Sequence, residues 1–300
     1  HLATRAFNSA LNKGEYDFTQ EKKLWYEQIL RLIALTHDLG HAPFSHASED
    51  LLPDGLQHED YTSKIIKETC IADYINEIGD KFVVKYGEEY DITPELICNI
   101  YNWDDPGENS EFTFLNSFME GEMDCDKMDY LLRDSLYCGV NYGKYDLERL
   151  LASLTIYSKE GMPRLAMEYG GIQAFEEFVL ARYFMFIQVY FHRTRRYFDM
   201  MLFEALKDVL PNGTYPSDVK EYLSWDDHKV IELIKANVNN SPSCNNIINR
   251  IVYPAVIETK PHPQSGDNKY HESRIKQVQR EFGEENFIED FAAKLPHKIP

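Results

Sequence analysis

The chain has 300 residues, which is enough for one large domain or for a main domain with a smaller one beside it. Hydrophobic residues make up 43% of it, which argues against disorder, and the net charge of −19 disfavours non-specific binding to nucleic acids and anionic membranes. The longest apolar stretch, residues 178–191, is too short to span a bilayer and contains Arg182 and Gln188. We therefore expect a globular protein with neither a nucleic-acid partner nor a membrane partner.

The cysteines indicate a reducing compartment. Their number, 5, is odd, and no CxxC pair occurs among them. This usage is unlike that of a disulfide framework or a zinc knuckle. We therefore expect a cytoplasmic protein.

The first part of the chain has helical patterns. Apolar residues at helical spacing predict a helix over 20–39, with Thr19 as its N-cap. Gly40 breaks this pattern, so His37 and Asp38 are expected at the C-terminal end of the helix, where it opens into a loop. Further helices are predicted over 61–78, 94–102, 111–119, 122–137 and 147–153. A turn is predicted at 105–107.

The pattern changes after residue 153. Residues 154–157 and 165–167, on either side of a turn at 159–161, predict a short β-hairpin. A long helix is expected to follow from residue 172 to about 208.

The last third is richer in Asn, Ser and Pro, beginning at Pro211. A helix is expected there at 226–237, and polar loops are expected near 239–246 and 259–273. The predicted fold class is therefore mainly α with a short β-hairpin. We expect two parts, a helical core over 1–210 and a smaller helical or mixed subdomain over 211–300.

The segment 36–46, with the sequence THDLGHAPFSH, contains three histidines and an aspartate. His37 and Asp38 at a helix end can both reach one ion, because their side chains diverge by roughly 100°. His41 lies about one turn further along. A neutral imidazole with carboxylates suits a divalent ion such as Mn, Mg, Fe or Zn. Surface or capping histidines are the alternative, which this density of histidines makes the less favoured one.

A second segment, residues 121–134, has an acidic helical face. Asp126, Tyr130 and Asp134 repeat at helical spacing and so share one side of the predicted helix. Taken by itself, such a face is most often only solvated. Its place downstream of the His-Asp cluster makes it a candidate part of the site.

His37 and Asp38 followed by Asp126 resemble the H…HD…D signature of the HD superfamily, in which two histidines and two aspartates hold a metal. The blocks THDLGHAPFSH, QHE at 57–59, DCDKMDYLLRDS and ARYFMFIQVYFHR resemble the deoxynucleoside triphosphate triphosphohydrolases. That subfamily includes the vertebrate SAM-and-HD-domain enzyme and bacterial relatives. The resemblance covers about residues 1–206 and implies an HD-domain helical core.

The resemblance also implies roles for individual residues. The implied metal ligands are His37, Asp38 and Asp126. The implied catalytic residues are His41, His46, His58 and Glu49, with Glu49 orienting an imidazole and His41 or His46 as the general acid or a phosphate contact. The implied substrate-binding residues are Lys127, Tyr130, Asp134, Arg182 and Tyr190. In this scheme Asp134 binds the 3′-hydroxyl, and a tyrosine against C2′ excludes ribonucleotides.

One ligand of the family pattern has no counterpart here. The family's first histidine lies in a block shortly before the Leu-Ala that matches Leu2 and Ala3, so alignment places it ahead of His1. His1 itself matches a position that is not a ligand. We expect three of the four ligands in this chain, and hence a partly occupied or metal-free site.

The implied activity is metal-assisted hydrolysis at the α-phosphorus of a dNTP, which gives a deoxynucleoside and inorganic triphosphate. Two alternatives stay open. One is another HD phosphohydrolase, acting on nucleoside monophosphates, cyclic dinucleotides or alarmones, which would not need the face at 121–134 or the Arg182 and Tyr190 pair. The other is a non-catalytic regulator that binds dNTPs, which has little use for three pocket imidazoles.

The resemblance finally implies partners. We expect a homo-oligomer, either a dimer or a tetramer, with an activating nucleotide at the subunit interfaces. Residues 192–196, His-Arg-Thr-Arg-Arg, form a basic island in an acidic chain. Binding of a nucleotide phosphate and pairing with acidic neighbours are equally favoured roles for this island.

Overall fold

The structure of this chain is a computed structural model, and the residues that it describes are 1–14, 16–53, 55–101, 112–258, 265–283, 287–288 and 290. As the sequence predicts, the described residues are mainly helical, with a single antiparallel two-stranded hairpin. The predicted turn at 105–107 lies outside the described residues. No helix in the described part of the chain combines the length and the apolar character needed to cross a membrane.

The first part of the chain is a set of helices. Their bounds are α1 Leu2–Lys13, α2 Gln20–Thr36, α3 His58–Glu68, α4 Cys70–Tyr86, α5 Pro94–Tyr101, α6 Thr113–Asn116, α7 Cys125–Tyr137 and α8 Leu147–Ala152. Thr19 caps α2 as predicted, with its hydroxyl oxygen accepting the Lys22 N–H across 3.3 Å. The prediction of a single helix over 61–78 is wrong. Thr69 is extended there and accepts the Ile71 N–H across 3.3 Å, which ends α3 and begins α4.

The main core joins the helices that carry the two motifs. Phe7 of α1, Tyr26 of α2 and Phe114 of α6 are fully buried, and the ring of Phe18 stacks on Phe114 with centroids 5.6 Å apart. Met128 of α7 belongs to the same core. Each large side chain buried in this way stabilises the fold by roughly 1.5–3 kcal/mol. The core therefore fixes α2 and α7 with respect to each other.

The predicted hairpin is confirmed. It consists of β1 Leu154–Lys159 and β2 Met162–Met167, paired with Leu154 opposite Met167. The two residues of its turn, Glu160 and Gly161, both have positive φ, at 54° and 80°. Two-residue hairpin loops of this type match the twist of the strands they connect.

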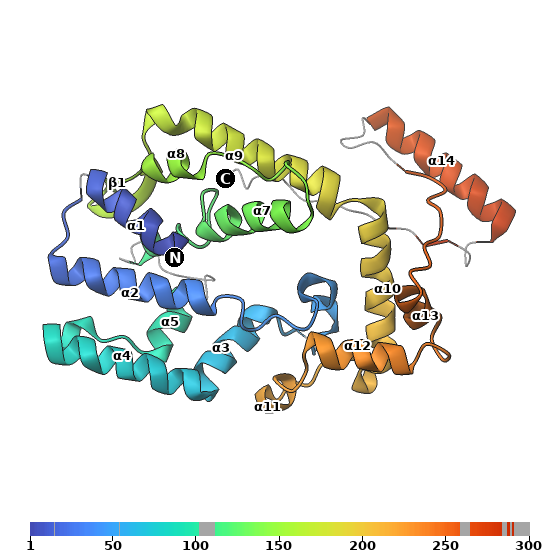
Figure 1. Cartoon of the computed structure of the whole chain (residues 1–300), viewed down its shortest axis with the longest axis horizontal. Helices are drawn as coiled ribbons and strands as arrows, with labels where there is room; N and C mark the ends of the chain where they lie inside the picture. The colour runs from blue at the N-terminus through green and yellow to red at the C-terminus, as the bar shows by residue number, and fades with distance from the viewer. Residues whose placement is uncertain are drawn as a thin grey trace.

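The long helix predicted from 172 to about 208 is interrupted. α9 spans Ile172–Met185, a π-helical turn covers Phe186–Tyr190, and α10 spans Arg193–Val209. His192 between them is extended, and its imidazole accepts the Thr194 N–H across 3.3 Å as the cap of α10. Figure 1 shows α10 turning steeply away from α9 toward α12 and α13. The sequence predicted one helix because the apolar periodicity continues across this break.

The C-terminal part adds α11 Val219–Tyr222, α12 Asp227–Ala236, α13 Pro242–Ile248 and α14 Ser265–Phe282. The loops predicted near 239–246 and 259–273 are wrong where α13 and α14 lie. Ser241 caps α13 by accepting the Cys244 N–H across 3.2 Å, with Pro242 in the first turn.

A second core lies under these helices. It includes Leu206 of α10, Tyr222 of α11 and Val230 of α12. Ala42 and Leu51, from the segment between α2 and α3, are buried in the same cluster. This segment therefore contacts the C-terminal part of the chain. The domain boundary at residue 210 stays a prediction.

Candidate active site

His37, Asp38 and Asp126 meet where the end of α2 faces the start of α7. The Nε2 atom of His37 lies 3.2 Å from Oδ2 of Asp38 and 3.6 Å from Oδ1 of Asp126. One ligand atom of each residue lies within 4.8 Å of the others. The Nδ1 atom of His37 is 3.2 Å from the Ala34 carbonyl oxygen. With Nδ1 donating to that oxygen, Nε2 is the ring atom that faces the carboxylates, and once deprotonated it can offer its lone pair to a metal held by them.

The charges of this trio are strongly coupled. Burial lowers the pKa of His37, but the hydrogen bonds that its ring donates to Asp126 and Asp38, and the charges of these carboxylates, outweigh burial and raise it to about 10. Burial likewise raises the pKa of Asp38, and the bond to His37 outweighs it, so that this pKa is lowered. The two carboxylates therefore favour a positive charge between them. One imidazole and two carboxylates form a donor set that fits Mn, Mg, Fe or Zn.

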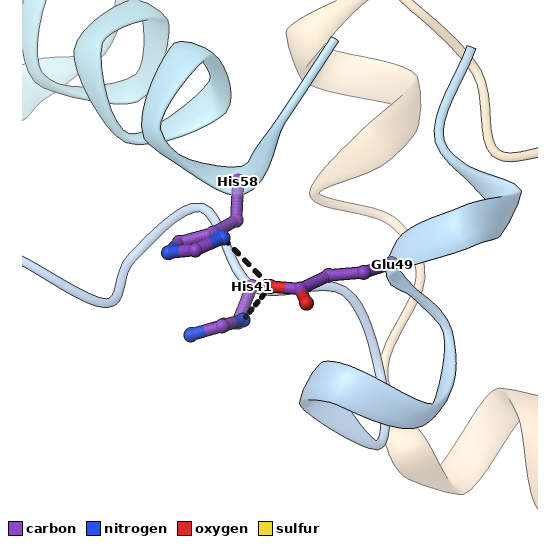
Figure 2. Close-up of side chains that lie close together, drawn as sticks. All are labelled: His41, Glu49 and His58. Atoms are coloured by element: carbon purple, nitrogen blue, oxygen red, sulfur yellow. Dashed lines mark ion pairs between the residues drawn. The ribbon is translucent and has the colours of Figure 1, made fainter. Parts of the chain in front are cut away.

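A second cluster surrounds Glu49 (Figure 2). Its Oε1 atom lies 2.7 Å from Nδ1 of His58 and 3.6 Å from Nδ1 of His41, and its Oε2 atom lies 3.1 Å from Nδ1 of His46. The rings of His41 and His58 stack with centroids 4.0 Å apart. Figure 2 shows the far nitrogens of both rings on the side away from Glu49. One carboxylate thus orients the imidazoles and leaves nitrogens open for proton transfer.

The pKa values in this second cluster are also shifted. Burial and then the neighbouring His58 lower the pKa of His41, so its imidazole is mostly neutral near pH 7. Burial raises the pKa of Glu49, but the bond to His46 and the nearby imidazoles outweigh it and lower that pKa. Ligand atoms of His41, Glu49 and His58 also lie within 4.8 Å of one another, as in a metal site. Because His58 and Glu49 already form an ion pair at 2.7 Å, we interpret the group as an acid-base cluster.

The two clusters touch. Nε2 of His41 lies 3.6 Å from Oδ1 of Asp38. Gly40 allows the start of α3 to pack closely against this segment, because a Cβ atom at Gly40 would lie 1.9 Å from the His58 carbonyl oxygen. The Gly40 N–H also donates to the Thr62 hydroxyl across 2.9 Å, and that hydroxyl donates to the His37 carbonyl oxygen across 3.2 Å. Sequence reasoning missed Thr62, since no local pattern connects α3 with the end of α2.

Four of the five predicted substrate-binding residues contact one another along α7, beyond Asp126. The Tyr190 hydroxyl donates to Oδ2 of Asp134 across 2.7 Å, and the rings of Tyr190 and Tyr130 lie edge to face at 6.3 Å. Burial raises the pKa of Tyr130, against a hydrogen bond from Arg182. Arg182 is buried and lies over the Phe186 ring, 5.3 Å from its centroid. The π-helical turn brings Tyr190 to Asp134, and such turns are frequent at functional sites.

Lys127 is placed differently. Its ammonium group bonds to the Asp124 carboxylate and to the Gly121 carbonyl oxygen, the latter across 3.0 Å. The structure therefore joins Lys127 to the turn before α7. Sequence reasoning missed Asp124, the buried N-cap of α7, whose Oδ1 atom accepts the Lys127 N–H across 2.7 Å. An aspartate just before a helical pattern is the signal that identifies such a cap.

Comparison with known families gives two matches. The HD domain matches residues 22–105, and the HD associated region matches residues 145–290. The first range contains His37, Asp38 and the whole Glu49 cluster, whereas Asp126 lies between the two matched ranges. The expected HD-domain helical core is therefore confirmed.

Three similar proteins extend this result. An uncharacterized protein of Methanocaldococcus jannaschii is 30% identical over 71% of this chain and 40% of its own length. A deoxynucleoside triphosphate triphosphohydrolase SAMHD1 homolog of Dictyostelium discoideum is 26% identical over 76% of this chain and 42% of its own. The crystal structure of a phosphohydrolase from Bacteroides thetaiotaomicron covers 94% of this chain and 69% of that chain, with a TM-score of 0.64 at 23% identity. The chain thus spans less than half the length of either of the first two relatives, and the crystal structure supports the fold.

Proposed function

We propose that this chain, which carries an HD domain followed by an HD-associated region, is a metal-dependent phosphohydrolase whose substrates are dNTPs. The observation that carries this proposal is the direct contact of the two clusters. A donor set for a divalent ion, with His37 and Asp38, lies against an acid-base set, with His41 and Glu49, across 3.6 Å. Hydrolysis of a phosphate ester requires both kinds of group at one place.

His37, Asp38 and Asp126 would hold the metal. A divalent ion bound there supplies positive charge for the phosphate oxygens and lowers the pKa of water. The remaining chemistry belongs to the chain. Water attacks the α-phosphorus and releases a proton to solvent, the bond from phosphorus to the 5′-oxygen breaks, and a protonated imidazole gives its proton to that oxygen. His41 is suited to this step because the negative charge of a bound polyphosphate would favour its protonated form.

The dNTP class is supported by the polar group beside the clusters. The Asp134 carboxylate, held by Tyr190 across 2.7 Å, is suited to accept a hydrogen bond from a sugar hydroxyl. The Tyr130 and Tyr190 rings form an apolar wall on which a 2′-hydroxyl would lack a partner. Arg182 supplies a buried positive charge for a phosphate. The described homologue from Dictyostelium discoideum supports the same substrate class.

The test is a hydrolysis assay of the full-length protein with Mn or Mg and the four dNTPs, singly and mixed. We expect free triphosphate from wild type, none from a His37→Ala/Asp38→Ala variant, and wild-type release from His228→Ala, which removes an exposed histidine of α12. Activity only in the mixture would indicate an activating nucleotide.

The same assay separates the alternatives. Hydrolysis of nucleoside monophosphates, cyclic dinucleotides or alarmones in place of dNTPs would contradict the substrate class and leave an HD phosphohydrolase. Binding of dNTPs without hydrolysis in the presence of metal would contradict the enzymatic role and favour the regulator.

We also propose a homo-oligomer. Apolar side chains lie exposed at the end of α7 and along α9, namely Leu136, Tyr137, Leu180 and Phe184. Exposed apolar side chains of this size are suited to contact a second copy. Sedimentation of the full-length protein is expected to give a dimer or tetramer, and a monomer at micromolar concentration would contradict this.

The basic island at 192–196 faces acidic neighbours. Arg193 lies 3.4 Å from Glu258, and the Arg196 Nε atom donates to Asp290 across 2.9 Å. These contacts agree with the second of the two roles considered for the island. A nucleotide at this place would have to displace both carboxylates, so nucleotide activation stays a prediction.

A further inference from the structure

The segment between α2 and α3 carries His41 and Glu49 on an unusual backbone. Phe44 and Ser45 are consecutive residues with φ of 65° and 50°. Residues other than glycine rarely adopt this left-handed region, and two in succession are rarer still. Such a conformation persists only where the surrounding structure holds it. The groups that bond to this segment therefore decide where His41 and Glu49 lie.

Two side chains from the C-terminal part bond to the backbone on either side of His41. The buried Tyr222 hydroxyl of α11 donates to the Gly40 carbonyl oxygen across 2.6 Å. Oδ1 of Asp227, in the first turn of α12, accepts the Phe44 N–H across 3.1 Å. These bonds join residues 182 and 183 positions apart in sequence.

Packing supports the same connection. Leu51 is buried in the second core with Tyr222, and its carbonyl oxygen accepts the Tyr215 N–H across 2.9 Å. The Ser48 hydroxyl, which is fully buried, donates to the Pro43 carbonyl oxygen across 2.6 Å inside the loop. Residues 42–51 thus pack against the C-terminal part through Ala42 and Leu51, while Ser45, His46 and Asp50 stay exposed, and the polar bonds fix the course of the segment.

We propose that Tyr222 and Asp227 are positioning residues for the acid-base cluster. Their bonds hold the left-handed turn at Phe44, and that turn places His41 and Glu49 against His58. The catalytic consequence rests on the proposed function, whereas the structural consequence rests only on the loop. In this arrangement two residues of the HD-associated region position an acid-base cluster whose members all lie in the range matched by the HD domain.

The first test compares steady-state kinetics of full-length variants on dNTPs with Mn. Tyr222→Phe and Asp227→Ala are expected to lower kcat by roughly 10- to 100-fold, because a small displacement of a reacting group has an effect of this size. KM is expected to change little, since Asp134 and Arg182 lie on α7 and α9. Asp227→Asn keeps an accepting oxygen and is expected to restore most of kcat. An unchanged kcat in Tyr222→Phe and Asp227→Ala would overturn the proposal.

Tyr61→Phe is the matched control. The Tyr61 hydroxyl is also in the second core, but it donates to the Pro216 carbonyl oxygen across 2.8 Å and makes no bond to residues 40–52 that the structure records. The Tyr61 ring stacks on the Tyr222 ring with centroids 4.0 Å apart, in the same core. Tyr61→Phe and Tyr222→Phe each remove one hydroxyl, so the two variants lose the same volume. For Tyr61→Phe we expect a kcat near that of wild type. A fall as large as that of Tyr222→Phe would show general loosening of the core and overturn the positioning role.

The second test needs no substrate. Hydrogen-deuterium exchange of the full-length protein, read by mass spectrometry, is expected to be faster at residues 40–52 in Tyr222→Phe and Asp227→Ala. Exchange in residues 20–36 is expected to stay as in wild type. If wild type hydrolyses no dNTP, the proposed function fails while this measurement still decides the positioning role. Unchanged exchange at 40–52 would refute that role.

Discussion

The two clusters of the site are built in different ways. His37, Asp38 and Asp126 lie at the ends of α2 and α7, two helices anchored in the main core. His41 and Glu49 lie on a loop with left-handed residues, and this loop packs into the second core through Ala42 and Leu51. A donor set on rigid helix ends can keep its geometry when the rest of the site is disturbed. The acid-base set depends on contacts from the far end of the chain.

The largest expected effect concerns the donor set. Asp126→Asn is expected to lower kcat/KM by on the order of 10³-fold, because several kcal/mol of charge stabilisation are lost with the metal. It is also expected to abolish the rise in Tm that Mn or Mg produces in wild type, since a ligand stabilises only the state that binds it. Thermal melting with and without metal checks this. A full metal-dependent rise in Asp126→Asn would contradict the ligand assignment.

A second prediction separates the clusters. Glu49→Gln removes the charge that holds His41 and His58 and is expected to lower kcat by about 100-fold, in the range typical of general acid-base groups. Because Glu49 is not a member of the donor set, the rise in Tm with metal is expected to persist. Loss of that rise would mean that the two clusters form one metal site.

A third prediction concerns the contact between α3 and the end of α2. In Gly40→Ala the new Cβ atom would lie 1.9 Å from the His58 carbonyl oxygen and 2.4 Å from the Thr62 nitrogen. We expect a loss of about 3 kcal/mol in the free energy of unfolding, because backbone atoms have to move. Gly170→Ala is the control, since its nearest neighbour is the end of the Arg149 side chain at 3.2 Å. Urea unfolding measures both, and equal effects would argue against a close approach at Gly40.

The smallest expected effect tests how rigidly α2 is held. Thr19→Ala removes the N-cap of α2 and is expected to lower the free energy of unfolding by about 1 kcal/mol. Because burial along the helix fixes its C-terminal end, kcat/KM is expected to stay within about twofold of wild type. A large loss of activity in Thr19→Ala would show that burial in the main core does not hold the end of α2 rigidly.

Local sequence predicted where His37 and Asp38 lie in the fold. Helical spacing and the Thr19 cap place His37 and Asp38 at the end of α2, and the structure has them there. The resemblance to the HD superfamily implied that Asp126 is a metal ligand, and its carboxylate lies 3.6 Å from His37. Helix ends are accessible to such reasoning because caps and periodicity are encoded within a few residues.

Long-range features were not predictable in this way. The bonds of Tyr222 and Asp227 to the loop, and the engagement of Lys127 by Asp124, depend on how distant elements pack. The π-helical turn before Tyr190 has the same apolar pattern as an ordinary helix, so periodicity merged it with α9 and α10. The assigned roles of the site residues stay predictions until variants are measured.

We propose that the protein hydrolyses dNTPs at the α-phosphorus, and isotope labelling can test this reaction. The full-length protein would be incubated with Mn and a mixture of the four dNTPs in water enriched in oxygen-18, and the products would be identified by mass spectrometry. We expect unlabelled deoxynucleoside and triphosphate that carries one oxygen-18, because water attacks phosphorus and the 5′-oxygen leaves. Release of pyrophosphate or of single phosphates, or label in the deoxynucleoside, would contradict it.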